Sequence, residues 1–350
     1  MSNPPLFRDR TRAYFEFIAA VAYFFLARGV ARHAAAGLAS DAFVPLATQA
    51  MFLFLLIVGF AAFGLVLDRQ SNPISTQGLP FRRGWLHEAG LGVAVGWGAA
   101  VTCVLILALV GGIAIVLTTQ LSALGWLVSD AAFFALAAMA EEVAFRGYGF
   151  QRFAAVVGPI GASLGYAAFY ALVQAALPGS SRISVVVAVV FSLLLSTAYL
   201  RTRALWVSWG FNFAWKASRA LIFGLAVSGV TSHSPVVEGD PMGPFWITGG
   251  GFGLEGSWTA LLVLLAAMLV IYRVTRDLDF RYNAPVIVPG GIAVDLDAAA
   301  RRQHEAAMGA SESAPPPLVQ IIPVAVPPAS NPPAAPAPVA GRPGQDTPTH

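Results

Sequence analysis

The chain has 350 residues, of which 57% are hydrophobic and only 11% are charged, and its mean hydropathy is +0.69. Soluble domains carry about 25% charged residues, so this composition excludes an ordinary soluble domain and indicates a polytopic membrane protein. The isoelectric point near 9.2 reflects an excess of arginine, with Lys216 the only lysine. Such basicity suits loops that face anionic lipid. We therefore expect membrane lipid, and no nucleic acid, among the partners.

Eight apolar segments predict an all-α bundle of about eight transmembrane helices, since about 20 apolar residues cross the hydrocarbon as a helix. In chain order the segments are residues 13–27, 44–67, 89–117, 130–148, 159–177, 183–200, 204–227 and 258–272. Asp130 is expected to be the N-cap of the fourth helix, where a carboxylate complements the helix dipole.

The first segment has two interpretations. Three arginines precede it (Arg8, Arg10 and Arg12), and small residues at 34–37 could form a cleavage site, as in a secretory signal peptide. Glu16 interrupts the apolar run, which favours instead a first helix that is tilted or interfacial.

Counting arginines in the loops predicts that both termini are cytoplasmic, with the Glu141 end of the fourth helix on that side. This topology leaves Arg28, Arg32 and Arg182 on the opposite side. Residues 1–282 then form an integral membrane domain. Residues 283–350 are rich in proline and alanine, and this composition predicts a disordered cytoplasmic tail.

Glu141, Glu142 and Arg146 stand out because they lie at the end of an apolar segment. Charged groups inside a membrane are costly, so they usually face a cavity or a partner and have a function. On a helix Glu142 and Arg146 are four residues apart and can pair, which leaves Glu141 pointing about 100° away and available. One interpretation is a structural ion pair at the helix end. The other makes Glu141 a general base.

The segment Glu141-Glu-Val-Ala-Phe-Arg146-Gly-Tyr resembles the first motif, Glu-Glu-x-x-x-Arg, of the CAAX-processing and bacteriocin-processing intramembrane endopeptidases, the CPBP (or Abi) family. The resemblance extends over roughly residues 80–275. It implies a glutamate-dependent endopeptidase acting on a membrane-anchored or lipidated peptide, in the inner membrane of a bacterium. Glu141 would be the general base, and Glu142 with Arg146 would be its supporting pair.

The other two family motifs are altered. Gln174 stands where the second motif, Phe-x-x-x-His, has its histidine, and Asn212 and Lys216 stand where the third motif reads His-x-x-x-Asn. An amide can hold a water but cannot take its proton near neutral pH, whereas Asn212 and Lys216 can donate to an oxyanion. Alternatively, Gln174 and Asn212 are hydrogen-bonding contacts between helices, and Lys216 neutralises a glutamate in a closed ion-pair cluster.

Other chemistries find little support in the sequence. The five histidines lie in loops, at segment edges or in the tail, so we expect no metal and no other cofactor. Cys103 lies in an apolar run and is interpreted as core filler rather than as a nucleophile. Three functions remain: an intramembrane endopeptidase, a catalytically degenerate relative that binds a hydrophobic peptide or a membrane partner, and a transporter. The absence of an internal repeat in the sequence counts against the transporter.

Overall fold

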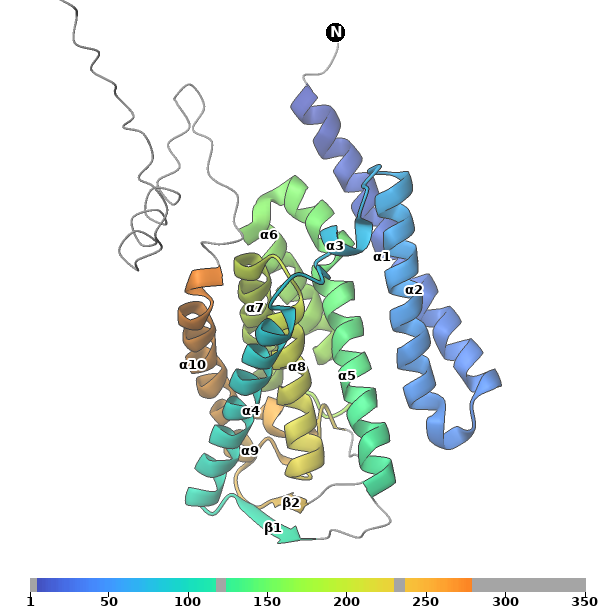
Figure 1. The fold of residues 1–350 in the computed structure, drawn as a ribbon. Coiled ribbons are helices and arrows are strands. Elements are labelled where there is room, and N and C mark those ends of the chain that lie inside the picture. The colour runs from blue at the N-terminus through green and yellow to red at the C-terminus, as the bar shows by residue number, and fades with distance from the viewer. Residues whose placement is uncertain (1–4, 118–123, 230–236, 279–350) are drawn as a thin grey trace, which may run out of the picture. The chain divides into compact units, whose positions relative to one another are not determined.

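The computed structural model describes residues 5–117, 124–229 and 237–278 (Figure 1). Helices dominate these ranges, and one short antiparallel sheet joins β1 to β2. The longer elements are α1 (Pro5–Leu38), α2 (Val44–Val66), α4 (Trp85–Leu109), β1 (Ile113–Leu117), α5 (Leu124–Arg146), α6 (Tyr148–Ala175), α7 (Arg182–Thr202), α8 (Trp206–Ala217), β2 (Val237–Pro241) and α10 (Trp258–Val274). The short helical turns are η1 (Asp41–Phe43), α3 (Pro73–Thr76), η3 (Ser218–Ile222), α9 (Phe245–Thr248), η4 (Gly250–Phe252) and η5 (Leu254–Gly256).

Five helical segments in the described ranges are long and apolar enough to cross a membrane. They are Arg10–Leu38, Asp41–Val66, Trp85–Leu109, Gly125–Ala175 and Arg182–Thr202. The prediction of a helical membrane protein is therefore confirmed. Each of the eight predicted segments contains a helix, but the count of eight spans stays a prediction. The tail predicted for 283–350 lies outside the described residues.

Several predicted boundaries are wrong. The first helix runs from Pro5 to Leu38, so Arg28 and Arg32 lie within α1 rather than in a loop. The segment 89–117 is not one helix, because α4 ends at Leu109 and residues 113–117 form β1 after the turn at Gly111, where φ is +68°. Glycine adopts this left-handed conformation without a steric penalty.

Two further corrections concern the site helices. Asp130 is not an N-cap, because α5 already includes Leu124 and Asp130 lies inside the helix. The seventh segment, 204–227, is helical only from Trp206 to Ile222, and its last turn, η3, is a π-helix. A π turn of this kind often marks a functional site.

Local sequence signals explain the ends of the helices beside the site. The side chain of Ser181 accepts from the backbone of Ser184 and the side chain of Ser184 accepts from Ser181, a reciprocal cap that begins α7. Helix α6 contains a kink at Gly158, where φ is 82° and ψ is 163°, and Pro159 begins its second half.

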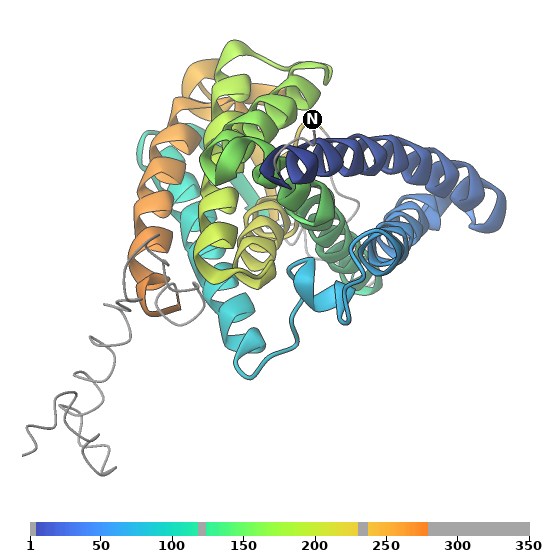
Figure 2. The same cartoon turned by 90° about the horizontal axis from the view of Figure 1, so that it is seen from above.

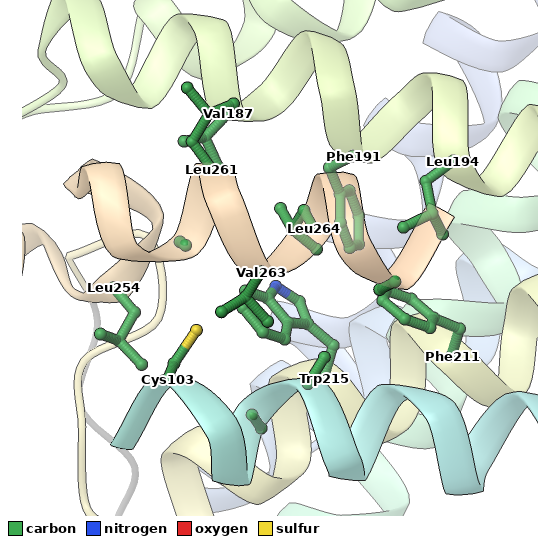
Figure 3. Close-up of a cluster of buried hydrophobic side chains, with 14 of the residues drawn as sticks. Cys103, Val187, Phe191, Leu194, Phe211, Trp215, Leu254, Leu261, Val263 and Leu264 are labelled. Carbon is green, nitrogen blue, oxygen red and sulfur yellow. The ribbon is translucent and has the colours of Figure 1, made fainter. Parts of the chain in front are cut away.

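The helices form two neighbouring groups (Figures 1 and 2). Helices α4, α7, α8 and α10 pack together, whereas α1 and α2 pair with each other and contact α6 and α5. The core of the first group includes Cys103, Phe211, Trp215 and Leu264 (Figure 3). Cys103 is fully buried there, which agrees with its interpretation as core filler.

The α4–α8 contact is the closest helix packing around the site. A Cβ atom added at Gly92 of α4 would overlap the backbone oxygen of Val207, and one added at Gly96 would lie 2.5 Å from the oxygen of Phe211. Small residues at such an interface let two membrane helices approach closely.

We predict that Gly92→Ala lowers the unfolding temperature of the purified protein in detergent, because the new methyl group forces α4 and α8 apart and overpacking typically costs about 1–3 kcal/mol. Gly98→Ala is the matched control, since a Cβ there meets nothing within 4 Å. Equal unfolding temperatures for the two variants would contradict this packing.

Candidate functional site

The first cluster of charged side chains lies between α5 and α8. Glu142 is fully buried, and its Oε1 accepts from Arg146 Nη1 at 3.2 Å and from Asn212 Nδ2 at 3.0 Å. The predicted pairing of Glu142 with Arg146 is thus present. Arg146 Nη2 also donates to the backbone oxygen and the hydroxyl of Ser192 on α7, at 3.0 and 3.1 Å. This pair therefore joins α5 to α7 as well as to α8.

Glu141 points away from that pair, as its position on the helix predicts, but it is not left available. Lys216 Nζ donates to both of its carboxylate oxygens, at 2.6 and 2.5 Å, and Asn212 Nδ2 donates to Oε2 at 3.1 Å. Asn212 and Lys216 are four residues apart on α8 and so share one face. The two substituted residues of the third motif therefore bind the glutamate itself rather than an empty oxyanion site.

Gln174 belongs to a second cluster, which was not predicted from the sequence. Its Nε2 donates to Ser228 Oγ at 3.2 Å and to Glu255 Oε2 at 3.4 Å. Glu255 is paired with Arg219 at 2.7 Å and accepts from the Ser228 hydroxyl at 2.6 Å. Burial alone would raise the pKa of Glu255, but the positive charges of Arg219 and Lys216, together with hydrogen bonds from Ser228 and Arg219, outweigh it, so the pKa is lowered.

A signal for this second cluster was present in the sequence. Arg219 is a charged residue in an apolar segment and requires a partner. Its partner Glu255 lies in the loop before α10, far away in sequence, and nothing in the local pattern indicates that these two segments meet.

The two clusters border the same cavity of about 290 Å³, which is lined by Glu141, Lys216, Gln174 and Ser228, among others. A second cavity of about 300 Å³ shares Glu141, Lys216 and Ser228 with it. The side chain of Glu141 is 32% exposed, whereas that of Lys216 is only 9% exposed. The structure thus joins five of the six predicted site residues in one hydrogen-bonded network, in which Glu141 and Lys216 line the cavity while Glu142, Arg146 and Asn212 lie buried behind them. Gln174 lines the same cavity but belongs to the second cluster.

Metal-binding side chains do not converge in the part of the chain that the structure describes, where no group of three or more histidine, cysteine or acidic residues could hold an ion. The prediction of no metal and no cofactor stays a prediction.

These features define a class: a helical membrane protein with carboxylate–cation clusters buried beside a cavity between its helices. Residues 123–218 match the family model for type II CAAX prenyl endopeptidase Rce1-like proteins. All six site residues lie in the matched segment. The resemblance seen in the sequence is therefore confirmed over residues 123–218, and it stays a prediction for the rest of residues 80–275. No curated protein and no solved structure matches the chain.

We predict that Arg146→Gln strongly destabilises the protein, by about 3–5 kcal/mol, because it leaves the buried carboxylate of Glu142 without its cation. Thermal unfolding in detergent measures this loss. Arg83→Gln is the control, since Arg83 is exposed and a surface charge contributes little.

The double variant Glu142→Leu with Arg146→Met should recover most of the lost stability, because an apolar pair of similar volume removes both buried charges. If Arg146→Gln and Arg83→Gln unfolded at the same temperature, the buried pair would not have the structural role assigned to it.

Proposed function

We propose that this protein is a catalytically degenerate member of the CPBP family, which binds the end of a membrane-anchored peptide in the cavity beside Glu141 without cleaving it. The single observation that carries the proposal is the contact between Lys216 Nζ and both carboxylate oxygens of Glu141, at 2.6 and 2.5 Å.

This contact opposes general-base catalysis. A base must accept a proton from the attacking water, but the Lys216 ammonium and the Asn212 amide take up three of the roughly four lone-pair positions of the Glu141 carboxylate. Gln174 cannot supply the missing base, because an amide does not take a proton near neutral pH. A lost proton-transfer partner alone typically lowers the rate by about 10²- to 10⁴-fold.

The cavities support a binding function. An apolar cavity of about 260 Å³, lined by Phe24, Ala144 and Phe145 among others, adjoins the polar one through these same three residues. A hydrocarbon chain fits the apolar part by its chemistry, and a peptide backbone fits the polar part, where it meets side chains such as Gln174 and Ser228. A lipidated peptide combines both features, and the matched family is named for cleaving prenylated CAAX peptides.

A second candidate is an active endopeptidase that uses Glu141 as general base, supported by Glu142 and Arg146. The partial exposure of Glu141 toward the cavity, 32% of its side chain, favours it. In this case a bound substrate would draw Lys216 away from Glu141, so that Lys216 and Asn212 donate to the oxyanion while Gln174 holds the water.

We predict that the full-length protein in lipid nanodiscs cleaves none of a panel of lipidated, membrane-anchored peptides, as followed by mass spectrometry. The variant Gln174→His, Asn212→His, Lys216→Asn should gain cleavage, because it frees Glu141 and restores the family's histidines. Adding Glu141→Gln to this variant should abolish the gained activity and is the control for glutamate catalysis.

A photo-cross-linking version of the same peptides should label the wild-type protein near the cavity. Cleavage by the wild-type protein that is lost in Glu141→Gln would establish the second candidate instead. Absence of both cleavage and labelling would refute both functions.

A further inference from the structure

Two arginines of α1 line the same cavity as Glu141 and are not used by the network described above. Arg28 and Arg32 are one helical turn apart on one face of α1 and border the cavity together with Glu141 and Lys216. In the described ranges neither guanidinium has an ion-pair or hydrogen-bond partner, in contrast to Arg146, Arg152 and Arg219.

The charges around the cavity therefore do not balance. Lys216 is neutralised by its contact with Glu141. Arg28 is near enough to Glu141 for Coulombic attraction, but neither Arg28 nor the exposed Arg32 forms an ion pair with a carboxylate in the described ranges, so the two arginines add positive charge to the cavity. Positive charge in a hollow between membrane helices is costly unless an anion accompanies it. The cavity is thus suited to a ligand with a negatively charged group.

The neighbouring side chains restrict the kind of anion. On α1 the apolar cavity is lined by Phe17, Val21 and Phe24, which lead along one face of the helix to Arg28. The ligand therefore combines a hydrocarbon chain with an anionic group. Gln49 and Gln174 border the polar cavity as well, and side-chain amides are suited to peptide groups, whereas a lipid phosphate requires only the arginines.

We propose that Arg28 and Arg32 bind the terminal carboxylate of the membrane-anchored peptide, so that the protein selects chains that end within the cavity. The planar guanidinium group can grip a carboxylate through two parallel hydrogen bonds, which makes arginine well suited to this task. This inference rests on the proposed function, in which the cavity binds a peptide. It adds that the free C-terminal carboxylate is the part of the peptide that the two arginines recognise.

The test compares two synthetic lipidated peptides of the same sequence, one with a free C-terminal carboxylate and one with a C-terminal amide. Their binding to the full-length protein in nanodiscs of neutral lipid is measured by fluorescence anisotropy. We expect the acid to bind at least about tenfold more tightly than the amide, since charge-assisted hydrogen bonds are lost with the amide.

The variant Arg28→Gln with Arg32→Gln should bind both peptides with the weak affinity of the amide, and Arg28→Lys with Arg32→Lys should retain part of the preference. Arg10→Gln removes a charge from an exposed position of the same helix and should leave the preference unchanged. Unfolding temperatures identify any variant that fails to fold.

Equal binding of acid and amide to the wild-type protein would overturn the inference. A different result would assign the two arginines to lipid headgroups instead. In that case soluble short-chain phosphatidylglycerol would bind only when both arginines are present, and the protein would bind the acid and the amide peptide equally. Peptide cleavage by the wild-type protein would refute the proposed function, but it would leave this comparison valid, because acid and amide can then be compared as substrates.

Discussion

Buried charge in an apolar helical bundle is the constraint on which the rest of this structure depends. A carboxylate or a guanidinium between membrane helices is costly unless it is paired. In the two clusters of the site, three acidic side chains are paired with three basic ones: Glu142 with Arg146, Glu141 with Lys216, and Glu255 with Arg219. The last two pairs cross from one element to another. The Glu141–Lys216 pair joins α5 to α8, and the Glu255–Arg219 pair joins the loop before α10 to η3. The contacts that offset the buried charges therefore also hold the elements of the site together.

Helix α8 can serve both the core and the site because its two faces differ. Phe211 and Trp215 are four residues apart and pack in the hydrophobic core. The next residue after each of them, Asn212 and Lys216 respectively, faces the glutamates. The close contact of Gly92 and Gly96 with α8 sets the position of this helix against α4. Packing on one side of α8 therefore determines which side chains reach the carboxylates on the other.

The substitutions in the second and third motifs change the chemistry of the site in a concerted way. Where the family motifs have two histidines and an asparagine, the resemblance places two amides and one ammonium group, and the ammonium group binds Glu141, the general base that the resemblance implies. The cavity itself remains, with its polar wall and its apolar extension. A cavity beside a carboxylate that is already hydrogen-bonded supports the binding function that we propose.

The sequence alone determined the membrane class and most of the helices, because apolar runs are local patterns. The charges that interrupt an apolar run singled out Glu141, Glu142 and Arg146, whereas Gln174, Asn212 and Lys216 were predicted from the resemblance to the family motifs. The Glu142–Arg146 pair was also predictable, since its spacing lies within one helix. Only the tertiary structure decided that Lys216 reaches Glu141, that Gln174 joins Glu255, and that Arg28 and Arg32 face the site. Each of these relations links helices far apart in the chain, and the packing that sets their rotation and depth leaves no local signature in the sequence.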